Sequence, residues 1–164
     1  MPLTLAPMTA DQLARLRLPL EHSYAENLAA ARHLSPEAAR AESALQIAQL
    51  LPDGVATPGV LLRLALVDDV EVGWIWVTLP RPGGPSNPST PWIHNIEVHP
   101  AHRGRGHAAR MIGLVEAELA RLGFDRLGLN VFADNTVAVR LYERLGFRVT
   151  AQQMSKPVGP PGPG

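Results

Sequence analysis

The segment from Trp92 to Phe132 constrains the fold more than any other part of this chain. A strand-like apolar run, Trp92–Val98, is followed by a helix-like run that ends near Leu122. A second strand-like run covers Arg126–Phe132. Two strands joined by one helix are predicted to lie parallel in one sheet, with a right-handed crossover between them.

The junction between the first of these strands and the helix carries the sequence RGRGHA, Arg103–Ala108. Gly104 and Gly106 let the backbone approach a ligand closely with its N–H groups pointing outward. The start of the following helix adds the positive end of its dipole, and Arg103 and Arg105 add full positive charge. These features predict a phosphate site, most directly for the pyrophosphate of a nucleotide-like cofactor.

Composition narrows the classes of protein to consider. The chain has 164 residues, and one domain is predicted over residues 1–156, followed by a Pro/Gly-rich disordered tail over residues 157–164. The 15 basic and 15 acidic residues balance, which argues against general binding to nucleic acid or to a membrane surface. The absence of cysteine excludes disulfides and thiolate catalysis. Neither a signal peptide nor a membrane span is evident, so a cytoplasmic location is predicted.

Three histidines, His99, His102 and His107, gather around the glycine-containing loop. Their spacing offers no further ligand that would suit zinc. They are therefore interpreted as surface loop histidines, and no metal site is predicted.

Hydrophobic periodicity, capping residues and turn residues place the remaining elements. Trp74 and Trp76 lie two residues apart on a predicted strand, so both should face one side of the sheet, in the core or in a pocket wall. The elements predicted outside Trp92–Phe132 are a strand at Leu3–Ala6, two helices within Asp11–Leu51 that break at Ser35–Pro36, a hairpin of Gly59–Val67 and Glu71–Leu79 that turns at Asp68–Asp69, a loop at Pro80–Pro91, a helix capped by Asp134 or Asn135 and ended by Gly146, and a last strand at Phe147–Val149.

Three spaced motifs on these elements resemble those of the GCN5-related N-acetyltransferase (GNAT) superfamily. An apolar-x-Val-x-Pro pattern ends the strand Trp92–Val98, and the loop that follows matches Gln/Arg-x-x-Gly-x-Gly/Ala. The third motif places Asn and Ala before Leu-Tyr-Glu and Gly-Phe. The resemblance is weakest over Asp11–Leu51. The residues that carry the motifs are Ile96, Val98 and Pro100, then Arg103, Gly106 and Ala108, then Asn135, Ala138, Leu141, Tyr142, Glu143, Gly146 and Phe147.

The resemblance implies an α/β fold with a central mixed, mostly antiparallel sheet, in which one parallel pair of strands splays apart and helices cover both faces. It implies acetyl transfer from acetyl-CoA to a primary amine by direct attack in a ternary complex, without a metal. The pantetheine arm would lie along the backbone of Ile96–Val98, and the N–H of Val98 would polarise the thioester carbonyl. The residues assigned to the cofactor are Ile96, Glu97, Val98, Arg103, Gly104, Arg105, Gly106, His107, Ala108, Asn135 and Tyr142.

The same resemblance implies the catalytic groups. Tyr142 matches the family tyrosine that donates a proton to the departing thiolate. The amine must lose a proton before it attacks; His94 is the first candidate for the base, and Glu97 is the second. Strand alternation would put these two side chains on opposite faces unless a bulge intervenes. Asn135 is expected to cap its helix, to contact the cofactor, or to do both.

Other interpretations of the function remain open from the sequence. Gly104-x-Gly106-x-x-Ala109 satisfies a loose dinucleotide fingerprint, with Asp134 as a ribose ligand, although few residues follow for a doubly wound sheet. A CoA-binding sensor or partner module without catalysis would share the same fold. The amine and the length of the acyl group are not fixed by the sequence, a homodimer is allowed, and carboxylates that could face a cationic acceptor are Glu21, Glu26 and Glu42.

Overall fold

The computed structural model describes residues 2–81 and 89–159. Within these ranges the strands form one sheet in the order β1-β2-β3-β4-β5. Every neighbouring pair is antiparallel except β4 and β5, which are parallel. In chain order the elements are β1 (Leu3–Pro7), α1 (Ala10–Arg32), α2 (Pro36–Leu50), the short helix η1 (Gly54–Ala56), β2 (Val60–Val67), β3 (Val70–Thr78), β4 (Trp92–Val98), the short helix η2 (Pro100–His102), α3 (His107–Arg121), β5 (Gly128–Leu129) and α4 (Thr136–Arg144).

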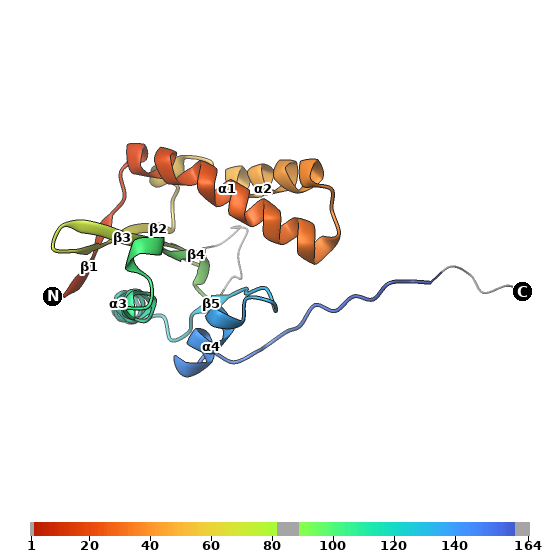
Figure 1. Cartoon of the computed structure of the whole chain (residues 1–164). Coiled ribbons are helices and arrows are strands. Elements are labelled where there is room, and N and C mark those ends of the chain that lie inside the picture. Colours follow the sequence, from red (N-terminus) through yellow and green to blue (C-terminus); the bar gives the residue numbers. More distant parts are fainter. Residues whose placement is uncertain (1, 82–88, 160–164) are drawn as a thin grey trace, which may run out of the picture.

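Helices cover both faces of the sheet (Figure 1). One face, here called the α1 face, packs Trp74 and Trp76 of β3 against the apolar side of α1 and the end of α2. The opposite face, here called the α3 face, packs Ile75 and Val77 of β3 against α3 and against Tyr142 of α4. The mixed sheet with helices on both faces confirms the predicted fold class, and the two tryptophans share one face as expected.

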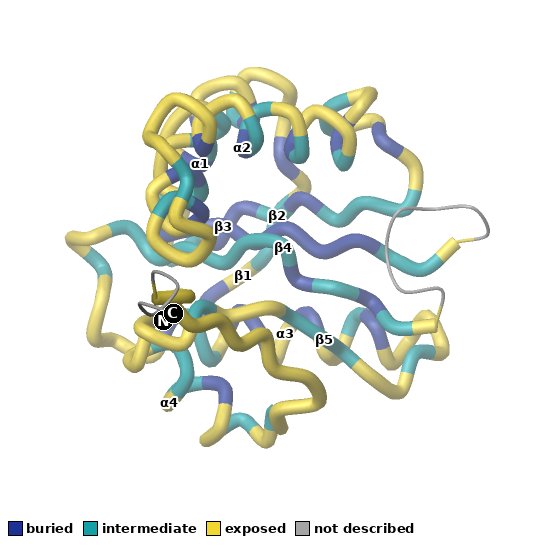
Figure 2. The backbone as a smooth tube through the Cα atoms, turned by 90° about the vertical axis from the view of Figure 1, so that its right-hand side faces the viewer, coloured by how far each residue is buried: buried dark blue, intermediate teal, exposed yellow. Residues whose placement is uncertain are grey.

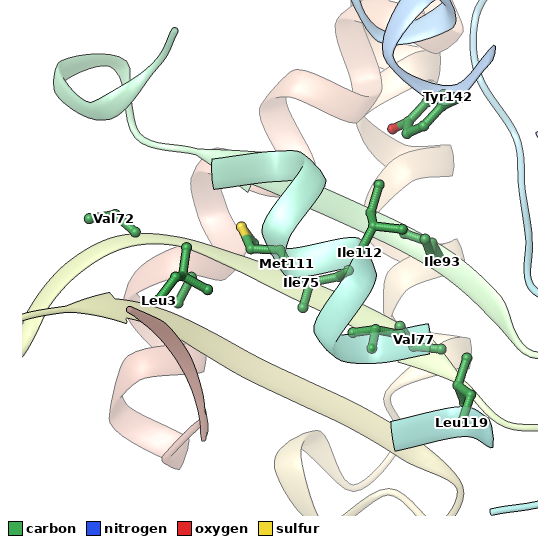
Figure 3. Close-up of a cluster of buried hydrophobic side chains, with 11 residues drawn as sticks. Leu3, Val72, Ile75, Val77, Ile93, Met111, Ile112, Leu119 and Tyr142 are labelled. Atoms are coloured by element: carbon green, nitrogen blue, oxygen red, sulfur yellow. The ribbon is translucent and has the colours of Figure 1, made fainter. Parts of the chain in front are cut away.

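Burial follows this three-layer arrangement (Figure 2). Buried stretches run along β3 and along the inner sides of the helices, whereas the outer sides of α1 and α2 are exposed. Figure 3 shows the cluster on the α3 face, where Met111 and Ile112 of α3 lie over the strands and Tyr142 enters from α4. Residues far apart in sequence therefore share one continuous core.

Local sequence explains where the first two helices begin and where the hairpin turns. Thr9 and Gln12 form a capping box at the start of α1, and Ser35 caps α2 with Pro36 at its first position. Asp68 and Asp69 connect β2 to β3 with φ angles of 51° and 62°. These left-handed angles match the two-residue turn that favours the twist of a hairpin.

Strand β4 carries an irregularity that positions the site. Its register with β3 passes from Trp76 opposite Asn95 to Val77 opposite Ile93, so that His94 has no partner of its own. This is a β-bulge. On its other side β4 pairs with β5 only at Trp92 and Ile93. Beyond Ile93, the edge of β4 that faces β5 is therefore not covered by a strand within the described residues.

Two predicted strands differ from the structure. The second strand of the parallel pair was expected over Arg126–Phe132 but is restricted to Gly128–Leu129. The last strand expected at Phe147–Val149 is wrong, since these residues are not in a strand. Phe147 packs against the α3-face core, while Arg148 and Val149 are exposed. The apolar character of this segment therefore reflects one partly buried aromatic ring, not pairing with a neighbouring strand.

Two further predictions fall partly on residues that are not described. The predicted loop Pro80–Pro91 includes residues 82–88, and the predicted tail includes residues 160–164, and both stretches lie outside the described ranges. The described residues 151–159 have no regular secondary structure and are exposed.

Candidate functional site

The loop between β4 and α3 has the backbone geometry of an anion site. Gly104 and Gly106 have φ angles of 74° and 76°, which favour glycine over any other residue. Both are exposed, and a Cβ built on either would meet no atom within 4 Å. Gly106 precedes the first residue of α3, and no side chain caps this helix start. The first backbone N–H groups of α3 are therefore open to a ligand.

The two arginines of this loop have different surroundings. The Nε of Arg103 donates a hydrogen bond of 2.9 Å to the carbonyl oxygen of Val98, so this side chain ties the loop to the end of β4. Arg105 is exposed and lines a cavity of about 450 Å³ between the β2–β3 hairpin and the start of α3. The lining residues of this cavity are Val67, Asp68, Val70, Val72, His102, Arg105, His107 and Arg110.

His107 begins α3 and is buried, with 7% of its surface exposed. Burial, together with Arg110, Arg105 and His102, lowers the pKa of His107 below its ordinary value. His99 is also partly buried, because its side chain contacts Glu71. The interpretation of His107 as a surface loop residue is therefore wrong, whereas His99 and His102 are partly exposed.

The unpaired edge of β4 lies beside this loop. Ile96 and Val98, which were predicted to contact the pantetheine arm, follow the last residue that pairs with β5. Their side chains pack against the α3-face core. Their backbone lies along the open edge, because pairing with β5 ends at Ile93. Such an edge offers unpaired N–H and C=O groups to an extended ligand.

Tyr142 and Asn135 lie on the α3 side of this edge. Tyr142 has 9% of its surface exposed, and burial raises the pKa of its hydroxyl. Its ring contacts Phe147 edge-on, with ring centroids 5.6 Å apart. The side chain of Asn135 accepts a hydrogen bond of 3.2 Å from the backbone N–H of Ala138 and so caps α4. Of the two roles expected for Asn135, the capping role is confirmed.

The two candidate bases lie together on the α1 face. The His94 ring stacks against Trp76 with centroids 4.8 Å apart, and Glu97 Oε2 accepts a hydrogen bond of 3.2 Å from Trp74 Nε1. Alternation alone would separate His94 from Glu97, but the bulge at His94 restores them to one face. Burial lowers the pKa of His94 to about 4.

Several polar atoms on the α1 face lack hydrogen-bond partners within the described structure. They belong to Trp76 and Thr78 on β3 and to the bulge residues His94 and Asn95 on β4. Buried polar groups without partners are rare and costly, so water or a ligand is expected to satisfy them. The atoms are Trp76 Nε1, Thr78 Oγ1, His94 Nε2 and Asn95 Nδ2.

Glu97 also belongs to a series of contacts between polar side chains. Its Oε1 lies 3.7 Å from His99 Nδ1, and His99 Nε2 lies 2.8 Å from Glu71 Oε1. The guanidinium of Arg15 in α1 contacts both oxygens of Glu71, at 2.7 and 3.3 Å. Burial alone would raise the pKa of Glu71, but the hydrogen bonds from Arg15 and His99 outweigh it and hold that pKa below its usual range.

Sequence reasoning missed this series of contacts. Arg15 and Glu71 are 56 residues apart, and Glu71 and His99 are 28 residues apart. No spacing motif marks such pairs, and only the fold brings α1, β3 and β4 together at this point. The pairs Glu71–Arg15 and Trp74–Glu97 required the tertiary structure.

The acidic residues predicted to attract a cationic acceptor are mostly engaged elsewhere. Glu21 accepts a hydrogen bond of 2.8 Å from Arg17 one turn earlier on α1. Glu42 lies 3.8 Å from Arg32, and Glu26 is exposed. Glu26 and Glu42 therefore fit solvated helix faces, whereas the side chain of Glu21 is 20% exposed and is held by Arg17.

The described residues add two negative findings. Within residues 2–81 and 89–159, no group of three or more His, Cys, Asp or Glu side chains is arranged to hold a metal ion. None of the helices in the same ranges combines the length and the apolar character needed to cross a membrane.

Comparison with known proteins agrees with this geometry. Residues 24–147 match the family described as "Acetyltransferase (GNAT) family". A Bacillus subtilis protein named "Uncharacterized N-acetyltransferase YycN" is 31% identical over 157 residues, which is 95% of this chain and 99% of that protein. The crystal structure of YycN superposes with a TM-score of 0.87 and 28% identity, and the match covers 97% of this chain and all of that one.

A more distant neighbour shares the fold alone. This is AAC(6')-Iy in complex with the bisubstrate analogue CoA-S-monomethyl-acetylneamine. It matches with a TM-score of 0.61 at 17% identity, covering 97% of this chain and 99% of that chain.

The chain therefore belongs to the GNAT family of acetyltransferases. It is an acyltransferase, and the family uses acetyl-CoA to acetylate amines. The dinucleotide-binding alternative is excluded, because the sheet is antiparallel except for one strand pair.

Proposed function

We propose that this protein transfers the acetyl group of acetyl-CoA to a primary amine by direct attack in a ternary complex. The observation that carries the proposal is the position of the open β4 edge. The glycine loop follows the end of this edge. Glu97 lies on the α1 face of the sheet, and Tyr142 lies on the α3 face. A thioester laid along this edge would be reached by the amine from the α1 face and by Tyr142 from the α3 face.

The loop amides would hold the cofactor. The open N–H groups at the start of α3 and the left-handed backbone at Gly104 and Gly106 suit a pyrophosphate. Arg105, His107 and Ala108 would lie close to it, while Arg103 fixes the loop through Val98. The N–H of Val98 would polarise the thioester carbonyl.

Glu97 is proposed as the base that prepares the amine. His94 is the other candidate, but its Nε2 is buried, and burial lowers its pKa to about 4. Glu97 lies on the same face and keeps a side chain that is 36% exposed, so it is open to an acceptor. Its hydrogen bond from Trp74 fixes the direction of the carboxylate.

In the proposed reaction, Glu97 and Tyr142 account for every proton that the amine loses and the thiolate gains. Glu97 takes the first proton from the ammonium, and the free amine attacks the thioester carbon. The C–S bond breaks as the amide forms, and Tyr142 gives its proton to the departing thiolate. The nitrogen then releases its second proton, which restores the tyrosine. Burial keeps the hydroxyl of Tyr142 protonated before this step, since it raises its pKa.

An acetyl-CoA consumption screen tests the proposal. The purified protein is incubated with acetyl-CoA and a panel of amines that includes amino acids, polyamines, amino sugars and a peptide with a free N-terminus. Mass spectrometry identifies any acetylated product. Turnover on at least one amine, reduced about 100-fold in Glu97→Gln, is the expected result. Binding of CoA by calorimetry without turnover on any amine would instead support a non-catalytic CoA-binding module.

A further inference from the structure

We propose that residues 148–154, here called the C-terminal segment, form a strand only in a homodimer, where the segment of one copy pairs with the outer edge of β5 in the other copy. Each copy gives its segment and receives that of its partner, so the exchange is mutual. In a single copy of the chain these residues are not in a strand. The inference goes beyond acetyl transfer and does not depend on it.

The C-terminal segment has no partner in the structure. Residues 148–159 are exposed, and they make no hydrogen bond or ion pair with any residue that the structure describes. Val149, Met154 and Val158 have 70%, 88% and 90% of their surface exposed. Both the backbone and the large apolar side chains of this stretch would therefore gain from a surface that covers them.

The residue types of the C-terminal segment suit a strand. Val149 and Ala151 alternate with Thr150 and Gln152, which is the period of two that gives a strand one apolar face. Val149 and Thr150 are also β-branched, a type that strands favour. The segment lacks a neighbouring strand, whereas its own sequence is compatible with one.

The outer edge of β5 is open in the same structure. β5 is the last strand in the order of the sheet, so within the described residues no strand pairs with its edge away from β4. Proteins commonly protect such edges with charged residues or proline. Residues 127–132, LGLNVF, contain neither, and Val131 is 37% exposed. This edge can therefore accept one more strand.

The course of the chain favours the β5 edge of a second copy over its own. The N–H of Phe147 donates a hydrogen bond of 3.0 Å to the carbonyl oxygen of Tyr142, and the two rings are in contact, so the start of the segment is fixed. From there the chain runs away from α4 and from the sheet (Figure 1). Residues 148–156 contain neither glycine nor proline, the residues that most readily reverse a chain.

A second copy satisfies both features at once. Two copies related by a two-fold axis can exchange their segments, which leaves neither the segments nor the β5 edges unpaired. A different protein could pair with the segment but would leave the edge of β5 open. The chain is therefore complementary to itself, which favours the homodimer.

Sedimentation of the full-length protein over a range of concentrations tests the proposal. The wild type should form a dimer that dissociates on dilution. Thr150→Pro removes a backbone N–H from the proposed strand, and Val149→Asp places a charge on its apolar face. Each change should raise the dissociation constant of the dimer by about 100-fold. Their circular dichroism spectra should match that of the wild type, because neither residue has a partner within one copy.

Val137→Asp is the matched control. Val137 lies on α4, outside the proposed strand, and is 81% exposed. It tests whether a new negative charge at an exposed valine is enough to separate the copies. The dissociation constant should stay at the wild-type value, and a rise equal to that of Val149→Asp would overturn the assignment to the C-terminal segment.

Hydrogen exchange separates the two possible partners of the segment. The amides of residues 148–154 should be protected at concentrations where the dimer forms and should lose this protection on dilution. Protection that does not depend on concentration would place the segment on its own sheet and overturn the exchange.

Two further results would overturn the proposal: a wild type that is monomeric at every concentration, and a dimer in which these amides stay unprotected. None of the readouts uses acetyl transfer, so the failure of this inference and the failure of the proposed function can be told apart.

Discussion

The two faces of the sheet differ in their proposed roles and in how far apart in the sequence their functional residues lie. The glycine loop leads into α3, and Tyr142 on α4 belongs to the core of the α3 face; the loop and α4 are each encoded by a short motif that is contiguous or nearly so in sequence. The α1 face holds His94, Glu97 and their partners, which come from elements far apart in the chain. The cofactor side is thus local in sequence, and the proposed acceptor side is assembled only by folding.

This contrast has a physical basis. Diphosphate binding needs a particular backbone shape and a helix start, and both are specified by a few adjacent residues. Placing a base requires a carboxylate with a fixed direction, and the hydrogen bond that holds Glu97 comes from Trp74 on β3. Changes on the two faces should therefore have different signatures, with effects on cofactor affinity on one face and on pH dependence on the other.

The substitution Gly106→Val is expected to have the largest effect and to act on the cofactor side. A β-branched residue at a φ of 76° is strained, and its side chain would occupy the open space above the loop where the diphosphate is proposed to lie. The dissociation constant for CoA, measured by calorimetry, should rise by about 1,000-fold, or about 4 kcal/mol. Unchanged affinity would contradict the loop assignment.

Gly113→Ala is the control for this change. Gly113 lies in α3, is exposed, and has no atom within 4 Å of its built Cβ. Alanine should stabilise the helix by about 1 kcal/mol without changing CoA affinity.

The α1 face predicts a pH-dependent stability through His94. The pKa of His94 is lowered from 6.5 to about 4 by burial, so between these values the unfolded chain binds a proton that the folded chain does not. Stability is therefore complete above pH 6.5 and falls as the pH drops toward 4, by about 3 kcal/mol.

Urea unfolding at pH 7 and pH 4.5 measures this loss. His94→Leu should lose less stability between these two pH values than the wild-type protein, since the variant lacks the group that titrates. His22→Leu, which removes an exposed histidine of α1, should behave as the wild type. Equal losses in wild type and His94→Leu would show that the pKa of His94 is not lowered by folding.

Gly73→Ala tests how closely β3 and β4 approach beside Glu97. A Cβ at Gly73 would overlap the carbonyl oxygen of Glu97, so the two strands must separate locally. Overpacking of this kind should cost about 2 kcal/mol of unfolding free energy. Because the shift moves Glu97 and also Val98, whose N–H is proposed to polarise the thioester carbonyl, both kcat and the affinity for CoA should fall. Unchanged kcat would contradict the role proposed for this part of β4.

Tyr142→Phe is expected to have the smallest effect. The ring keeps its edge contact with Phe147, so the melting temperature should change little. Loss of the hydroxyl should lower kcat about tenfold, or about 1.4 kcal/mol, with unchanged affinity for CoA. Turnover equal to that of the wild type would remove Tyr142 as the proton donor to the thiolate.

Much of the fold could be predicted because its elements are encoded locally. The capping box at Thr9, the Ser35–Pro36 helix start and the Asp68–Asp69 turn all lie where their residue types favour them. The strand predicted at Phe147–Val149 is wrong, because Phe147 is apolar through its packing on the α3-face core and not through strand pairing. In so short a segment, a residue that is apolar because its ring packs in the core and a residue of a paired strand give the same hydrophobic pattern.

The sequence alone determined the strand–helix–strand unit, the glycine loop and the Asn-to-Phe motif of α4, because each depends on residues that are neighbours in the chain. Only the tertiary structure decided that His94 and Glu97 share a face, since this depends on a bulge set by pairing with β3. It also decided that Arg15, Glu71 and His99 meet behind Glu97. Electrostatic contacts depend on distance in space, and spacing along the chain carries no signal for residues that folding brings together.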